Sequence, residues 1–197
     1  MTLRTGSPAP AFELPSTGGA SISLASLAGN KVVLYFYPKD QTPGCTVEAC
    51  DFRDRHGPIV ASGAIVLGVS KDSLASHDKF RTKYTLPFPL LTDADSAVAK
   101  AYGAYGQKMM YGKPVIGTIR TTVVIDEQGR VAHVWSPVKV AGHGDAVLAF
   151  LRGEAPPAPA PAKKAAPARK TAPARKAAPA KKAKAKKPAS ARKKGRR

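Results

Sequence analysis

The chain has 197 residues, and its formal net charge of +19 is unevenly distributed. Residues 1–154 hold 16 lysines and arginines with all 13 acidic residues, whereas residues 155–197 hold the other 16 basic residues and no acid. The second segment also has no leucine, isoleucine, valine, methionine or aromatic residue, so it cannot build a hydrophobic core. The sequence therefore predicts one folded domain over 1–154 and a disordered basic tail over 155–197.

Membrane and export segments are not expected. No stretch reaches the roughly 18 to 20 apolar residues that a membrane-spanning helix needs. The N-terminus has one basic residue, Arg4, and no apolar run of the kind found in secretory signals. Two cysteines in such a chain favour redox chemistry over a structural disulfide. We expect a cytoplasmic protein with no membrane span.

The first part of the domain alternates strand-like and helix-like segments. Residues 12–14 and 21–24 flank a Ser-Thr-Gly-Gly turn and predict a short hairpin. The run 31–37 is continuously apolar and β-favouring, as expected for a strand buried on both faces. A helix is predicted from about residue 43 to residue 56, followed by a second buried strand over 64–70.

The second part continues this alternation and then changes. Residues 103–117 are rich in glycine and are predicted to form a loop. Alternating strands and helices imply a central sheet covered by helices on both faces, and an antiparallel hairpin near the end makes that sheet mixed. The fold class predicted is α/β, a thioredoxin-like fold with a central mixed sheet and flanking helices. The remaining predicted elements are a helix over 73–84, a strand over 89–92, a helix over 95–102, a hairpin of 120–126 with 130–135, and a last helix ending near 152.

Both cysteines lie where the first long strand passes into the predicted helix. Cys45 follows the turn residues Thr42-Pro43-Gly44, and Cys50 comes five residues later. A thiol in the first turn of a helix faces unpaired backbone N–H groups and the positive end of the helix dipole. Such a setting lowers the pKa of a thiol and makes its sulfur reactive.

This segment resembles a known family. Pro38, Thr42 and Cys45 fit the P-x-x-x-T-x-x-C pattern of peroxiredoxins, and the string PKDQTPGCTVEACDFRD resembles the peroxiredoxin Q group, also called bacterioferritin comigratory protein. The likeness covers about residues 4–153 and leaves out the tail. It implies a thiol peroxidase that reduces hydrogen peroxide and organic hydroperoxides and is recycled by thioredoxin. We expect a monomer without a cofactor.

The resemblance also implies residue roles. Cys45 is expected to be the peroxidatic cysteine and Cys50 the resolving cysteine. Thr42 and Arg120 are expected to position the peroxide. In the substrate pocket, Glu48 is expected to help hold Arg120.

Pro38, the remaining pocket residue implied by the resemblance, is expected to shield the thiolate.

Three of the roles have plainer alternatives when the residues are taken alone. Arg120 could be a strand arginine paired with a carboxylate, Glu48 could serve the helix dipole, and Thr42 could be a turn or capping residue. The four histidines show no ligand spacing with the cysteines, so no metal is expected. A thioredoxin-type reductase is disfavoured because the C-x-x-C spacing is absent.

The chemistry sets requirements on this site. A cysteine with a pKa of about 8.5 is under roughly 10% thiolate at neutral pH, so ionisation alone gains only about tenfold. The larger contribution must come from donors aimed at the two peroxide oxygens. The Thr42 hydroxyl, the Cys45 N–H and the Arg120 guanidinium can supply them. Attack leaves a sulfenic acid, which condenses with a nearby thiol.

Helix geometry restricts that condensation. Residues five apart on a regular helix have Cα atoms roughly 8.7 Å apart. A disulfide needs Cα atoms within about 7 Å. Cys45 and Cys50 therefore cannot bond while the helix is intact, and its first turns are predicted to unwind after oxidation.

The tail suggests a second function. Its repeated Ala-Pro-Ala-basic-basic units resemble linker-histone tails, and a flexible chain of this charge should bind DNA non-specifically through counterion release. RNA and anionic membranes are rival targets, because charge alone does not choose among them. We expect a peroxidase tethered to DNA and associated with the nucleoid; the alternative is a nucleoid-associated DNA-coating protein whose peroxidase domain is secondary. The predicted DNA-binding residues are Lys163, Lys164, Arg169, Lys170, Arg175, Lys176, Lys181, Lys182, Lys184, Lys186, Lys187, Arg192, Lys193, Lys194, Arg196 and Arg197.

Overall fold

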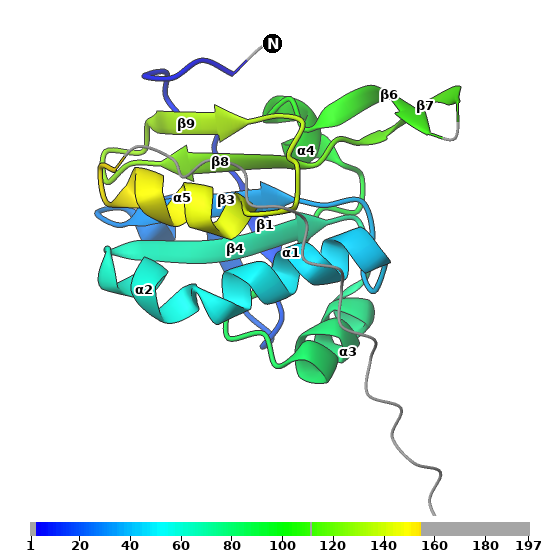
Figure 1. The fold of residues 1–197 in the computed structure, drawn as a ribbon, viewed down its shortest axis with the longest axis horizontal. Coiled ribbons are helices and arrows are strands. Elements are labelled where there is room, and N and C mark those ends of the chain that lie inside the picture. Colours follow the sequence, from blue (N-terminus) through cyan, green and yellow to red (C-terminus); the bar gives the residue numbers. More distant parts are fainter. Residues whose placement is uncertain (1–2, 111, 155–197) are drawn as a thin grey trace, which may run out of the picture. The chain divides into compact units, whose positions relative to one another are not determined.

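A computed structural model describes residues 3–110 and 112–154, so the predicted basic tail and its DNA-binding residues lie outside the described residues. A five-stranded sheet with the order β5-β4-β3-β8-β9 forms the centre of the fold (Figure 1). Strands β3, β4 and β5 are parallel, and β8 is antiparallel to both β3 and β9, so the sheet is mixed as predicted. The strand bounds are β3 Lys31–Phe36, β4 Ala64–Ser70, β5 Leu90–Thr92, β8 Thr121–Ile125 and β9 Val131–Trp135.

Helices cover both faces of this sheet, which gives the thioredoxin-like α/β fold that the sequence predicts. Helices α1, α2, α3 and α5 contribute to the core on one face, and α4 contributes to the core on the other (Figure 1). The small hairpin of β1 and β2 also packs on the α4 side. The bounds of these elements are β1 Glu13–Pro15, β2 Ser21–Ser23, α1 Pro43–Asp54, α2 His56–Ala61, α3 Leu74–Tyr84, α4 Ala97–Ala101 and α5 His143–Leu151, with a 3-10 turn over Ala25–Leu27.

The central strand β3 is buried on both faces, which explains its continuous apolar run. Val33, Tyr35 and Tyr37 belong to the core beneath α1, whereas the even-numbered residues of the strand belong to the opposite core. Because both faces are filled, the strand is fixed in position, and it delivers the chain to the start of α1 at a defined place. None of the described helices is long and apolar enough to cross a membrane.

Two sequence predictions about elements were wrong. The helix predicted to reach residue 56 ends at Asp54, because the backbone at Arg55 leaves the helical conformation, and α2 begins immediately afterwards. The predicted loop over 103–117 contains the antiparallel hairpin of β6 Tyr105–Met110 and β7 Lys113–Thr118. Glycine is unfavourable inside strands, and here Gly106 lies opposite Gly117. The glycine content of this segment therefore predicted a loop instead of the hairpin.

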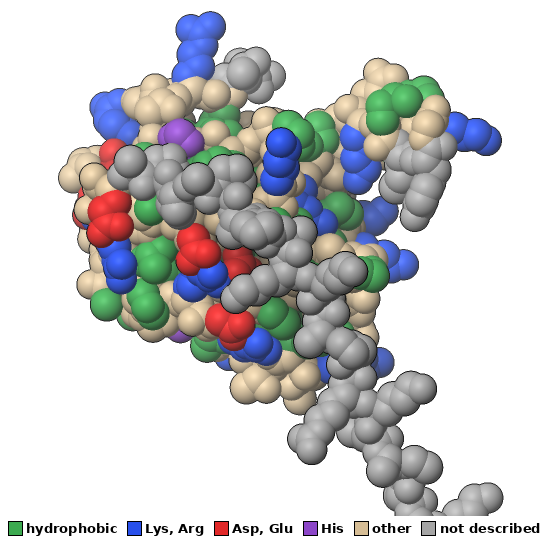
Figure 2. All heavy atoms as spheres, in the orientation of Figure 1, with side chains coloured by type: hydrophobic (Ala, Val, Ile, Leu, Met, Phe, Trp, Pro, Cys, Tyr) green, Lys and Arg blue, Asp and Glu red, His purple; other side chains and the backbone are tan. Residues whose placement is uncertain are grey.

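The β6–β7 hairpin is largely exposed. Met109 is 69% exposed and Ile116 is 75% exposed. Figure 2 shows hydrophobic side chains at this hairpin with basic side chains around them. A two-stranded hairpin is only marginally stable alone, so its position depends on the strands and helix to which it is attached.

Candidate active site

Cys45 is placed by a strand, a tight loop and a helix start. The N–H of Tyr37 donates to the Val69 carbonyl at 3.1 Å, which extends the pairing of β3 with β4 by one residue. Pro43 then begins α1, a position that suits proline because the first helical N–H has no intrahelical acceptor. Cys45 falls in the first turn and is only 2% exposed. Cys45 therefore belongs to the turn of α1 in which the first N–H groups have no intrahelical acceptor.

Arg120, which lies directly before β8, connects this sulfur to a carboxylate. Its Nη2 donates to Cys45 Sγ at 3.3 Å, and its Nη1 forms a short ion pair with Glu48 Oε2. Glu48 lies one turn after Cys45 in α1 and is 1% exposed. The structure therefore brings together Cys45, Glu48 and Arg120, which are separated by up to 75 residues in the sequence.

The charges of this group are strongly affected by burial. Burial raises the pKa of Glu48 to about 7, although the neighbouring Arg120 pulls it in the other direction. The second carboxylate oxygen, Oε1, is buried and has no hydrogen-bond partner among the described residues. Burial also acts to lower the pKa of Arg120, but Glu48 and Cys45 outweigh it and the net shift is upward. The guanidinium therefore stays charged beside the sulfur.

The other predicted site residues lie around this centre. Thr42 directly precedes α1, and its hydroxyl donates to the Lys39 carbonyl at 3.1 Å, so it must rotate before it can donate to a peroxide. Pro38 is half-buried at the end of β3. Cys50 is half-buried in the same unbroken helix as Cys45, and both are free thiols. Burial raises the pKa of Cys50, with Arg53 opposing the shift.

Gly44 is a functional position that the sequence reasoning missed. A Cβ atom at this position would lie 3.3 Å from Arg120 Nη2, so any side chain would crowd the guanidinium. The absence of a side chain lets Arg120 approach the first turn of α1 closely. The signal in the sequence was a glycine directly before Cys45. The residue that Gly44 contacts, Arg120, lies far along the chain, so the sequence alone did not indicate the contact.

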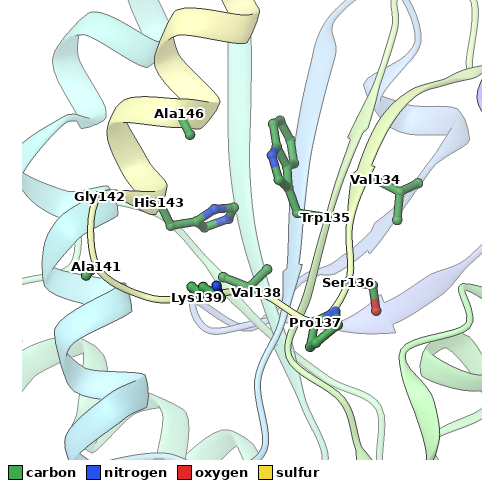
Figure 3. Close-up of a pocket in the computed structure, with 10 residues that line it drawn as sticks. All are labelled: Val134, Trp135, Ser136, Pro137, Val138, Lys139, Ala141, Gly142, His143 and Ala146. Carbon is green, nitrogen blue, oxygen red and sulfur yellow. The ribbon is translucent and has the colours of Figure 1, made fainter. Parts of the chain in front are cut away.

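A separate cavity of about 430 Å³ lies between β9 and the start of α5. Figure 3 shows the rings of Trp135 and His143 on its walls; their centroids are 5.5 Å apart and their planes are nearly perpendicular. His143 Nε2 is 2.7 Å from Thr122 Oγ1, and burial, with a smaller contribution from Arg120, lowers the pKa of His143 to about 4. The lining contains none of the predicted site residues, so the cavity and the reactive sulfur are distinct features.

Comparisons with known proteins show the family of this chain. The AhpC/TSA family profile matches residues 5–134. Peroxiredoxin Bcp of Xanthomonas campestris is 47% identical over 150 residues, which cover 75% of this chain and 94% of that protein. Peroxiredoxin Bcp of Bacillus subtilis is 43% identical over 152 residues, which cover 77% and 97%. A solved structure of Xanthomonas campestris bacterioferritin comigratory protein, studied for alkyl peroxide reduction, has a TM-score of 0.71 at 43% identity and covers 76% of this chain and 98% of that chain.

The chain therefore belongs to the AhpC/TSA family of thiol peroxidases. Within that family, its relatives place it with the peroxiredoxins of the Bcp group, also called peroxiredoxin Q. The matches cover 94% and 97% of these two relatives but only 75% and 77% of this chain, so the relatives correspond to the domain without the tail.

Replacing Glu48 by glutamine tests the buried carboxylate. The folded protein holds the Glu48 proton up to about pH 7, whereas the unfolded chain releases it near pH 4.5, so Glu48 makes the wild type less stable as the pH rises between these values. We expect the stability of the wild type relative to Glu48→Gln to fall by about 2 to 3 kcal/mol from pH 5 to pH 8. Urea denaturation at both pH values measures this, and a difference that stays constant or rises contradicts the prediction.

Proposed function

We propose that this protein reduces hydrogen peroxide and organic hydroperoxides through a Cys45 sulfenic acid and a Cys45–Cys50 disulfide, which thioredoxin then reduces. The observation that carries this proposal is the Arg120 guanidinium, 3.3 Å from Cys45 Sγ and paired on its other side with Glu48. A cation at this distance stabilises a thiolate and leaves N–H groups that can donate to a bound peroxide.

The first step is displacement at oxygen. The Cys45 thiolate attacks one peroxide oxygen, the O–O bond breaks, and the other oxygen leaves as hydroxide or alkoxide and takes a proton from solvent. The sulfur loses two electrons to the peroxide and becomes a sulfenic acid. Arg120, the first-turn N–H groups of α1 and the Thr42 hydroxyl, once rotated, are the donors for the charge that develops on the two oxygens.

The second step requires α1 to open. In the intact helix, the Cα atoms of Cys45 and Cys50 are roughly 8.7 Å apart, beyond the limit of about 7 Å for a disulfide. When the first turns unwind, the Cys50 sulfur attacks the sulfenic sulfur, an S–S bond forms and water leaves. The attacking species is the thiolate, and burial in the intact helix raises the pKa of Cys50, so opening of the helix exposes this thiol and favours its ionisation.

Cysteine variants separate the two steps. Cys45→Ser should lose peroxidase activity, whereas Cys50→Ser should still reduce one equivalent of peroxide without forming the intramolecular disulfide or turning over with thioredoxin. In the wild type, disulfide formation should accelerate with pH below the pKa of Cys50, up to about tenfold per pH unit, because the thiolate fraction of Cys50 grows. Stopped-flow kinetics with mass spectrometry measures both effects. Turnover of Cys50→Ser with thioredoxin at the wild-type rate would contradict the role of Cys50.

We also propose that the tail tethers the enzyme to DNA without reading its sequence. The support is the charge distribution, with 16 basic residues and no acid in residues 155–197, and no stacking aromatic residue among them. A tethered enzyme would remove peroxide close to the nucleic acid. The alternative of a DNA-coating protein differs in stoichiometry, because coating needs saturating protein and does not depend on Cys45.

Truncation after Glu154 tests the tether. If the tail engages about 8 phosphates, binding of the full chain to plasmid DNA should weaken with salt with a log–log slope near −7. The truncated chain should not bind but should reduce peroxide at the full rate. The control is the full chain with Cys45→Ser, which should bind DNA normally. Absence of binding near physiological salt would contradict the DNA proposal.

A further inference from the structure

A buried polar cluster lies next to the active-site loop. Asp40, two residues before Thr42, is 6% exposed, and His77 of α3 is fully buried. The Tyr37 hydroxyl donates to Asp40 Oδ1 at 2.8 Å and the Ser76 hydroxyl donates to Oδ2 at 2.7 Å. His77 Nδ1 is 2.9 Å from the same Oδ2. The carboxylate is therefore surrounded by donors from the end of β3 and from α3.

His77 joins the Asp40 carboxylate to the central sheet. Its Nε2 is 3.2 Å from the Leu91 carbonyl oxygen, while Nδ1 faces the Asp40 carboxylate. The Tyr37 hydroxyl is also 3.3 Å from Nδ1, so the ring contacts both the end of β3 and β5. Burial acts to raise the pKa of Asp40, but the hydrogen bonds from His77 and Ser76 outweigh it and the net shift is downward. Asp40 and His77 therefore form a buried hydrogen-bonded pair.

The Asp40–His77 pair fixes a strained loop. The backbone N–H of Asp40 donates to Asp72 Oδ2 at 2.8 Å, which also accepts from the Ser70 hydroxyl. The next residue, Gln41, has a φ of 58°. This left-handed conformation is unfavourable for a non-glycine residue and persists only where its surroundings enforce it. The anchored Asp40 thus sets the direction in which α1 begins.

A second cluster fixes α1 beyond the cysteines. Asp51 Oδ2 accepts from the Gly144 N–H at 2.7 Å, and Asp51 Oδ1 forms a short ion pair with Arg55. Arg55 also pairs with Asp145 at the start of α5. The two clusters therefore bracket residues 41–50, the segment that holds both cysteines.

We propose that Asp40 and His77 are a positioning pair that keeps the start of α1 closed for peroxide reduction and controls how readily residues 41–50 open for disulfide formation. The inference rests on the proposed function, because it requires a Cys45 sulfenic acid and Cys50 as its partner. Neither residue of the pair touches the sulfur; both act through the loop that carries it.

The sulfenic acid gives this control a measurable consequence. With α1 closed, a second peroxide can transfer an oxygen to the sulfenic sulfur, giving a sulfinic acid and water or alcohol. With α1 open, the Cys50 thiol displaces water and forms the disulfide. A weaker anchor lowers the free energy of local opening, so it should favour the disulfide over the sulfinic acid.

Asp40→Asn in the full chain is the direct test. Asparagine keeps the shape, but it removes the negative charge and replaces one of the two acceptor oxygens by an NH2 group. We expect Cys45 oxidation to slow by about tenfold, because the thiol is held less well beside Arg120. We expect the sulfinic fraction formed at high peroxide, measured by mass spectrometry, to fall several-fold. Ser76→Ala, which removes one hydrogen bond and suits a helix, should shift both quantities in the same direction but less.

Val131→Ala is the matched control. Val131 is buried in the core on the opposite face of the sheet, so its truncation lowers stability without touching the loop. The sulfinic fraction of this variant should equal that of the wild type. An unchanged fraction in both anchor variants, or an equal fall in Val131→Ala, overturns the inference. A wild type that forms no Cys45–Cys50 disulfide overturns the proposed function as well, which distinguishes the two failures.

Discussion

The contact of Arg120 with Cys45 is the interaction on which the rest of this site depends. Its guanidinium is shared between the sulfur and the buried Glu48 carboxylate, so neither charge is buried alone. The contact requires the first turn of α1 to lie against the start of β8, with Gly44 leaving room for the guanidinium. The buried strand β3, the tight loop after it and the helix start all serve to hold the sulfur at that place.

The same geometry creates a conflict between the two steps of the proposed reaction. Peroxide reduction needs an intact first turn, because the helix N–H groups and Arg120 must converge on one sulfur. Disulfide formation needs that turn to open, because an intact α1 keeps the cysteines too far apart. A helix that was too stable would leave the sulfenic acid unresolved, and one that was too loose would react slowly with peroxide. The stability of residues 41–50 is therefore a functional quantity.

The sequence predicted the parts of the fold that depend on local pattern. The strand over 64–70 matches β4 at both ends, since its apolar run is bounded by a glycine and by polar residues. The contact between Cys45 and Arg120 was reached only through the family resemblance, because 75 residues separate them. The Asp40–His77 pair could not be predicted, since neither residue carries a local signal and their contact exists only after α3 packs beside the loop.

Amide hydrogen exchange of α1 in the reduced and disulfide forms is the most direct test of whether this helix opens when the disulfide forms. We expect the amides of residues 46–54, whose carbonyl acceptors lie four residues earlier in residues 42–50, to lose protection in the disulfide form, while α2 amides such as Ile59, which donates to the Arg55 carbonyl, keep it. Equal protection along the whole of α1 in both forms would contradict this expectation, because the two cysteines would then be joined without opening the helix.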